Sequence, residues 1–142
     1  MSAAPSQDFS IEKTEDGFPC VHFPTCVVVK IDEHISEVRI REGAFVDETA
    51  LYLTKQANEF LFGSERYAVL VTTSNFNAIS EKARELSASA EFVRNTKGKA
   101  LLVHNSATKL VGNFYLNFNK PKMPTRLFTD RRKALAWLKT LK

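Results

Sequence analysis

The sequence predicts an α/β domain in which helices flank a mixed, mostly parallel sheet, with the element order β-β-α-β-α-β-α-β-α. In the last third of the chain, Pro121 must end a helix, a short strand at 125–128 follows, and Thr129-Asp130 begins a final amphipathic helix. Because helical segments connect the later strands, we expect those strands to be parallel. Two continuous apolar runs are typical of strands that are covered on both faces: YAVLV at 67–71 and ALLV at 100–103.

The first two strands are predicted to form an antiparallel hairpin. The segment 25–32 (TCVVVKID) is rich in β-branched residues, and a tight turn follows at 33–34. The segment 35–41 alternates between apolar and charged residues, which is typical of a half-exposed strand. Its apolar side chains are expected to face the core and its charged side chains to face solvent: Glu37, Arg39 and Arg41.

Each predicted helix begins at a residue that can cap it. Asp47 is a good N-cap for the first helix, and Gly63 fits the position just after its end. Ser80 caps the second helix, whose apolar residues keep helical spacing as far as Val93. A third helix begins at 105–106, and four of its apolar residues are expected to face inward: Leu110, Val111, Phe114 and Phe118.

The composition predicts one globular domain. The chain has 142 residues, of which 44% are hydrophobic and 25% are charged. We expect the domain to cover 25–142, and residues 1–24 to form a flexible tail or to add one strand near 21–23. No apolar run approaches the roughly 20 residues that span a bilayer, and no secretory leader is recognisable. We therefore expect a cytoplasmic protein without a membrane span.

The sequence predicts neither a metal site nor a cofactor. Cys20, His22 and Cys26 have no fourth ligand at a spacing known for zinc, and their apolar surroundings predict buried free thiols instead. The chain contains only five glycines, and they form no glycine-rich loop that could hold a phosphate.

Enzymatic activity is not predicted. His104 follows a strand at the carboxyl edge of the sheet, where open α/β sheets gather their ligands, but no acidic residue lies near it in sequence. Ser74 lacks the nucleophile elbow that activates a catalytic serine. We therefore expect no catalytic residues.

The basic charge of the chain predicts a solvated surface. The net charge is +4, and much of the excess lies after residue 119. A basic surface can bind nucleic acid, but no recognition helix or stacking motif accompanies this one. We therefore expect no nucleic-acid partner.

Five segments carry a family resemblance: LLV at 101–103, GNFYL at 112–116, NKP at 119–121, PTRLFT at 124–129 and ALAWL at 134–138. With them the chain resembles the STAS domain, and in particular small stand-alone bacterial proteins of unknown function described as STAS-like or SpoIIAA-like. The resemblance covers about residues 25–141 and is most specific at the C-terminal end. It implies the fold predicted above and a non-enzymatic regulatory or protein-interaction module.

The resemblance also implies a partner-binding or switch surface. In STAS proteins that switch partners, an Asp-Ser pair opens the helix after the central strand, and a kinase phosphorylates the serine. Ser80 stands here at the position of that Asp, and Glu81 stands at the position of the serine. A phosphate on Ser80 would be favoured by the helix N-terminus, although Ser80 can equally be a simple cap. The implied surface comprises Thr73, Ser74, Asn75, Ser80, Glu81, His104 and Asn105.

The alternative function is the binding of a small hydrophobic or anionic, lipid-like ligand. Eleven phenylalanines and the third helix could form an apolar pocket of the kind in which some STAS-like domains bind acyl ligands. Lys120 and Arg126 could form an anion site at its mouth, or Arg126 could protect an edge strand. The candidate contacts are Asn113, Tyr115, Lys120 and Arg126. The expected partners are therefore another protein, a second copy of the chain, or a small molecule.

Overall fold

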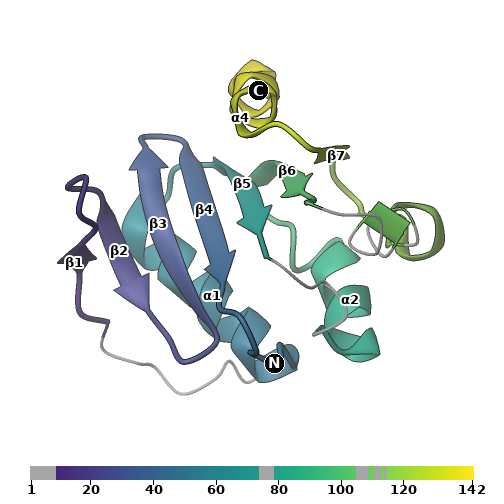
Figure 1. The fold of residues 1–142 in the computed structure, drawn as a ribbon, viewed down its shortest axis with the longest axis horizontal. Helices are drawn as coiled ribbons and strands as arrows, with labels where there is room; N and C mark the ends of the chain where they lie inside the picture. Colours follow the sequence, from purple (N-terminus) through teal and green to yellow (C-terminus); the bar gives the residue numbers. More distant parts are fainter. Residues whose placement is uncertain (1–8, 74–78, 105–108, 111–112, 114) are drawn as a thin grey trace.

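The structure, a computed structural model, describes residues 9–73, 79–104, 109–110, 113 and 115–142. Within these ranges, seven strands form one sheet in sequence order from β1 to β7 (Figure 1). Its elements are β1 (Glu12–Lys13), β2 (Pro19–His22), β3 (Cys26–Asp32), β4 (Ile35–Ile40), α1 (Glu48–Phe62), β5 (Tyr67–Thr72), α2 (Glu81–Ala88), β6 (Thr96–Leu102), the π-helix η2 (Tyr115–Asn119), β7 (Thr125–Phe128) and α4 (Arg131–Thr140).

The topology confirms the predicted mixed sheet of an α/β fold. Strands β1 to β4 pair antiparallel, and β4 to β7 pair parallel. The antiparallel part is larger than the predicted hairpin, because β1 and β2 add two strands in the region where the sequence left open a tail or one strand near 21–23. These strands are short, and β1 consists of Glu12 and Lys13, so no apolar run marks them in the sequence.

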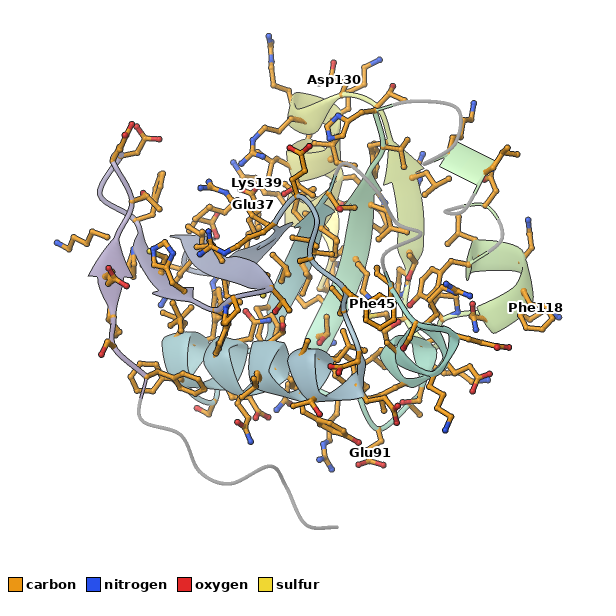
Figure 2. All side chains as sticks on the ribbon, turned by 60° about the horizontal axis from the view of Figure 1, so that its bottom comes forward. Glu37, Phe45, Glu91, Phe118, Asp130 and Lys139 are labelled. Atoms are coloured by element: carbon orange, nitrogen blue, oxygen red, sulfur yellow. The ribbon has the colours of Figure 1, made fainter. Side chains whose placement is uncertain are left out.

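Helices cover both faces of the sheet (Figure 2). On one face, α1, α2 and η2 pack on the larger core, to which the strands contribute Val38, Val69 and Leu101. On the other face, α4 packs on a smaller core that includes Leu70 and Ala100. Adjacent residues of β5 and β6 therefore point to opposite cores, as the two-residue period of a strand requires.

The predicted caps of α1, α2 and α4 are confirmed, whereas the predicted start of the third helix at 105–106 lies outside the described residues. The Asp47 carboxylate accepts a hydrogen bond from the Ala50 amide at 2.9 Å, and the Ser80 hydroxyl accepts one from the Ala83 amide at 3.1 Å. Gly63 ends α1 in the left-handed region, with φ of 63°, where a side chain would be strained. Asp130 begins α4 by accepting bonds from the amides of Arg132 and Lys133 at 2.8 and 3.3 Å.

Helix α2 ends earlier than the apolar spacing predicted. It stops at Ala88, although the helical pattern continues to Val93. The Ser89 hydroxyl donates to the Leu86 carbonyl at 2.7 Å and accepts from the Phe92 amide at 3.3 Å. These local bonds satisfy backbone groups outside a helix, which is how serine competes with helical structure.

Candidate functional site

A cavity of about 110 Å³ lies between the sheet and the helices α1 and α2. Its walls are mostly apolar and come from β3, β4, β5, β6, both helices, η2 and the segments between them. Its lining residues include Val69, Arg84, Ser87, Lys99, Leu101 and Tyr115. Ligand pockets in proteins are typically apolar with a few convergent polar groups, and this cavity has that composition.

A bulge in β6 brings Lys99 to the cavity side of the sheet. Tyr67 pairs with Thr96 and Val69 pairs with Lys99, so β6 contains one residue more than β5 over this stretch. The bulge contains Gly98, where a Cβ atom would lie 2.4 Å from Cδ1 of Leu141 and 3.0 Å from the backbone oxygen of Pro124, so a larger residue would force these neighbours to move. Beyond the bulge, Lys99 and Leu101 both line the cavity, in the alternation of a regular strand.

Lys99 begins a chain of hydrogen bonds at the cavity wall. Its Nζ donates to the Tyr115 hydroxyl at 3.3 Å, and the Tyr115 hydroxyl lies 3.0 Å from Oγ of Ser87. Ser87 donates its own proton to the Arg84 carbonyl at 2.9 Å. Tyr115 must therefore donate to Ser87 and accept from Lys99, which fixes the direction of each hydrogen bond in this series.

Arg84 brings a second cationic side chain to the same cavity. Its Nη1 donates to the Ile79 carbonyl at 2.7 Å, which holds the side chain against the start of α2. Its Nε is buried and has no hydrogen-bond partner in the part of the chain that the structure describes. A buried N–H without a partner is uncommon in proteins and calls for an acceptor at that position.

Burial shifts the pKa of three other groups along the cavity wall. Burial raises the pKa of Tyr67 to about 12, against a smaller lowering by its hydrogen bond with Thr96. Burial also raises the pKa of the Cys26 thiol, whose Sγ lies 3.5 Å from the Thr54 hydroxyl. Burial lowers the pKa of Lys55, which donates to the Arg94 carbonyl at 3.0 Å. A thiol with a raised pKa is a poor nucleophile at neutral pH.

A buried carboxylate on the opposite face of the sheet ties α4 to β4. The Glu37 side chain is only 2% exposed and accepts two hydrogen bonds from Arg131, at 2.9 and 2.5 Å. Arg39 and the Thr72 hydroxyl each donate a further bond to it at 3.2 Å. The predicted solvent-facing position of Glu37 is therefore wrong, because α4 places Arg131 over this end of the sheet.

This cluster predicts an acid-dependent loss of stability. Burial alone would raise the pKa of Glu37, but the hydrogen bonds and charges of Arg131 and Arg39 hold that pKa below its ordinary value of 4.5. Because the unfolded chain then binds the proton more tightly, the stabilisation is fully present above the unfolded-state pKa and is lost as the pH falls through the lower pKa of the folded state.

Chemical denaturation of the wild type and of Glu37→Gln, repeated from about pH 6 to about pH 3, measures this effect. The free energy of unfolding of the wild type should fall more steeply below about pH 4.5 than that of Glu37→Gln. Glu42→Gln, at an exposed glutamate that follows the same strand, serves as the control and should keep the steeper fall. If the free energy of unfolding fell equally steeply with pH in all three proteins, the lowered pKa of Glu37 would be contradicted.

The residues of the predicted partner surface are only partly described. Ser74, Asn75 and Asn105 lie outside the described residues. Thr73 is buried just after β5, and His104 is exposed beyond β6. Ser80 caps α2, and Glu81 is exposed in its first turn.

The residues of the predicted ligand site separate in the structure. Tyr115 lines the cavity, whereas Asn113 and Lys120 are exposed. Arg126 lies on the α4 side, with its guanidinium 5.1 Å from the ring centre of Phe128 and 5.5 Å from that of Trp137. Leu110 and Phe118 were expected to face inward, but they are 70% and 63% exposed, and Phe118 points outward from η2 (Figure 2), so the inward orientation is wrong for both. Val111 and Phe114 lie outside the described residues.

Sequence reasoning missed Lys99, Arg84 and Ser87, which form the polar part of the cavity. A signal for Lys99 was present, because it alternates with Leu101 and Val103 along one buried strand. A charged side chain at such a position must face the same core as its apolar neighbours. Arg84 and Ser87 lie three residues apart on α2 and therefore share a helix face.

Three further properties of the described residues are relevant to function. Cys20 and Cys26 are both buried free thiols, as expected. In the described ranges, no group of three His, Cys, Asp or Glu side chains is placed to hold a metal ion. Among the helices of those ranges, none combines the length and the apolar character needed to cross a membrane.

Comparison with known proteins places the fold. Residues 29–142 match the family described as Domain of unknown function (DUF7793). The chain is similar to the crystal structure of an uncharacterized DUF3478 protein with a SpoIIAA-like fold from Shewanella loihica PV-4, with 14% identity, a TM-score of 0.51 and 92% of each chain covered. This similarity confirms the SpoIIAA-like fold. A protein of unknown function from Arthrobacter sp. FB24 shares 24% identity over 79% of this chain and 97% of its own, with a TM-score of 0.30. No curated protein matches the sequence.

Proposed function

Because the chain belongs to the DUF7793 family, whose function is unknown, its cavity is the best guide to its role, and we propose that the protein is a non-enzymatic module that binds a small, largely apolar molecule between the sheet and the helices α1 and α2. The observation that carries this proposal is the cavity itself. Protein interiors are normally packed without voids larger than a water molecule. A space of about 110 Å³ inside a domain of this size is therefore a candidate binding site.

The side chains around the cavity favour binding over catalysis. Among the described lining residues there is no Asp, Glu or His that could act as a general base near neutral pH. The Cys26 thiol has a raised pKa, and the Tyr67 hydroxyl has a pKa of about 12, so neither supplies an activated nucleophile. The remaining polar groups can form hydrogen bonds, which suits the recognition of a ligand.

A regulatory or protein-interaction role remains the second candidate, and α2 connects it to the cavity. This helix contributes Arg84 and Ser87 to the cavity wall, and its first turn contains Glu81 of the predicted partner surface. A ligand that contacts Arg84 would therefore touch the same helix that a protein partner would contact at Ser80 and Glu81. This arrangement would let an occupied cavity alter the surface that is presented to a partner.

Titration with hexan-1-ol, followed by ¹H–¹⁵N NMR, tests the proposed function. Five buried methylene groups at about 0.8 kcal/mol each correspond to a dissociation constant on the order of 1 mM. We expect saturable shifts of amide signals around the cavity, including those of Val69 and Leu101, and little change at α4. Shifts that are non-saturable, or that are spread over the whole surface, would exclude a specific apolar site.

A further inference from the structure

We propose that the natural ligand of the cavity is a small carboxylate, and that Lys99 binds its anionic group. This inference rests on the proposed function, because it assigns a chemical class to the molecule that the cavity holds. It depends on three observations: the burial of a lysine with unused donors, the absence of a nearby acid to balance it, and the size of the apolar space beside it.

The first observation is that Lys99 is buried and only partly hydrogen-bonded. The residue is 8% exposed and lines the cavity. An ammonium group has three donors, yet within the described residues the Nζ of Lys99 donates only to the Tyr115 hydroxyl. Its remaining donors are therefore free to bind a ligand atom inside the cavity.

The second observation is the missing negative charge. Burying a charged group is costly unless an opposite charge and hydrogen bonds compensate it. In the described part of the chain, Lys99 and Arg84 form no ion pair, because the salt bridges there are those of Glu37 on the opposite face. The segments 74–78 and 105–108, which lie outside the described residues, contain no Asp or Glu in their sequence. An anionic ligand would therefore supply the negative charge that balances Lys99 and Arg84.

Lys99 supplies the cationic donor that suits a carboxylate. Its hydrogen bonds run through Tyr115 and Ser87 to the backbone carbonyl of Arg84, and the Arg84 side chain also lines the cavity. Charge-assisted hydrogen bonds are stronger than those between neutral groups. A carboxylate oxygen can therefore accept a strong hydrogen bond from the unused donors of Lys99.

The third observation limits the size of the ligand. A cavity needs about 10–15 Å³ of this kind of volume to hold one water molecule, so about 110 Å³ has room for roughly seven to eleven heavy atoms. The apolar part of the ligand should therefore contain about four to six carbons. Hexanoate is a suitable probe, and hexan-1-ol is a matched neutral probe with the same carbon number.

The experiment compares the two probes on the wild type and on Lys99→Met by NMR titration at neutral pH. For the wild type we expect hexanoate to bind about ten-fold more tightly than hexan-1-ol. Lys99→Met should lose this preference and keep its affinity for hexan-1-ol. Lys97→Met is the matched control, because Lys97 is two residues away on β6 and lies beside Leu138 and Leu141 of the α4 side.

The outcomes separate the two proposals. Equal affinities for hexanoate and hexan-1-ol in the wild type and Lys99→Met would overturn the carboxylate inference and leave the apolar site standing. Failure of both probes to bind the wild type would overturn the proposed function as well. Lys99→Gln keeps a polar side chain without the charge, so it should also lose the preference, and it replaces Lys99→Met if that variant is unstable. A preference retained by Lys99→Gln would contradict the role of the charge.

Discussion

Arg131→Met is expected to lower the free energy of unfolding by about 3 kcal/mol. Arg131 donates two hydrogen bonds to the Glu37 carboxylate, which is buried between the sheet and α4. Without Arg131, that carboxylate keeps its bonds from Arg39 and Thr72 but loses its two shortest ones. Removing one partner of a buried pair typically costs about 3–5 kcal/mol, and we expect the lower end because Arg131 itself is 43% exposed.

Urea denaturation measures this change, and Arg132→Met is the matched control. The Arg132 side chain is exposed and makes no hydrogen bond or ion pair within the described residues, so its replacement should change stability by less than about 0.5 kcal/mol. The double variant Glu37→Met/Arg131→Met removes both charges and should recover most of the loss. If Arg131→Met were no more destabilising than Arg132→Met, the pair would not hold α4 to the sheet.

Val69→Phe is expected to weaken the binding of hexan-1-ol by more than about ten-fold, because the phenyl ring occupies the space that the ligand needs. Val69 lies on the cavity side of β5 and belongs to the larger core. The ring fills existing space, so the folded state should be retained, although overpacking can cost about 1–3 kcal/mol. NMR titration gives the affinity, and thermal unfolding gives the stability of the same samples.

Two further variants test whether the loss of affinity comes from filling this cavity. Val69→Leu adds a single methylene group and should weaken binding less than Val69→Phe does. Leu70→Met is the control, because Leu70 is the next residue of β5 and faces the core under α4. Unchanged affinity in Val69→Phe, together with a normally folded protein, would mean that hexan-1-ol binds somewhere other than this cavity.

Local patterns in the sequence were sufficient to predict most of the fold. Asp47, Ser80 and Asp130 are capping residues whose effect depends only on the next three residues, so the starts of α1, α2 and α4 were predictable. The central strands β5 and β6 contain continuous apolar runs, which identify strands covered on both sides. Strands β1 and β2 have no such local signal, because the pairing of β2 with β3, and of β1 with β2, decides their conformation.

The candidate site was less predictable, because its burial is created by elements far apart in the sequence. Lys99 is buried by a bulge in β6 and by η2, and Glu37 is buried by α4, which begins 94 residues later. Alternation along a strand shows which side chains share a face, but it does not show which face another element covers. Tyr115, Lys120 and Arg126 were all predicted as ligand contacts. The sequence did not indicate that Tyr115 lines the cavity whereas Lys120 and Arg126 are exposed.

A crystal structure of the protein soaked in hexanoate would show directly whether the cavity binds a small carboxylate. We predict electron density for the alkyl chain between Val69, Leu101 and α2, with the carboxylate within hydrogen-bonding distance of the Lys99 Nζ. Density for hexanoate at another place, or a cavity closed by the side chains around it, would contradict the proposed binding site.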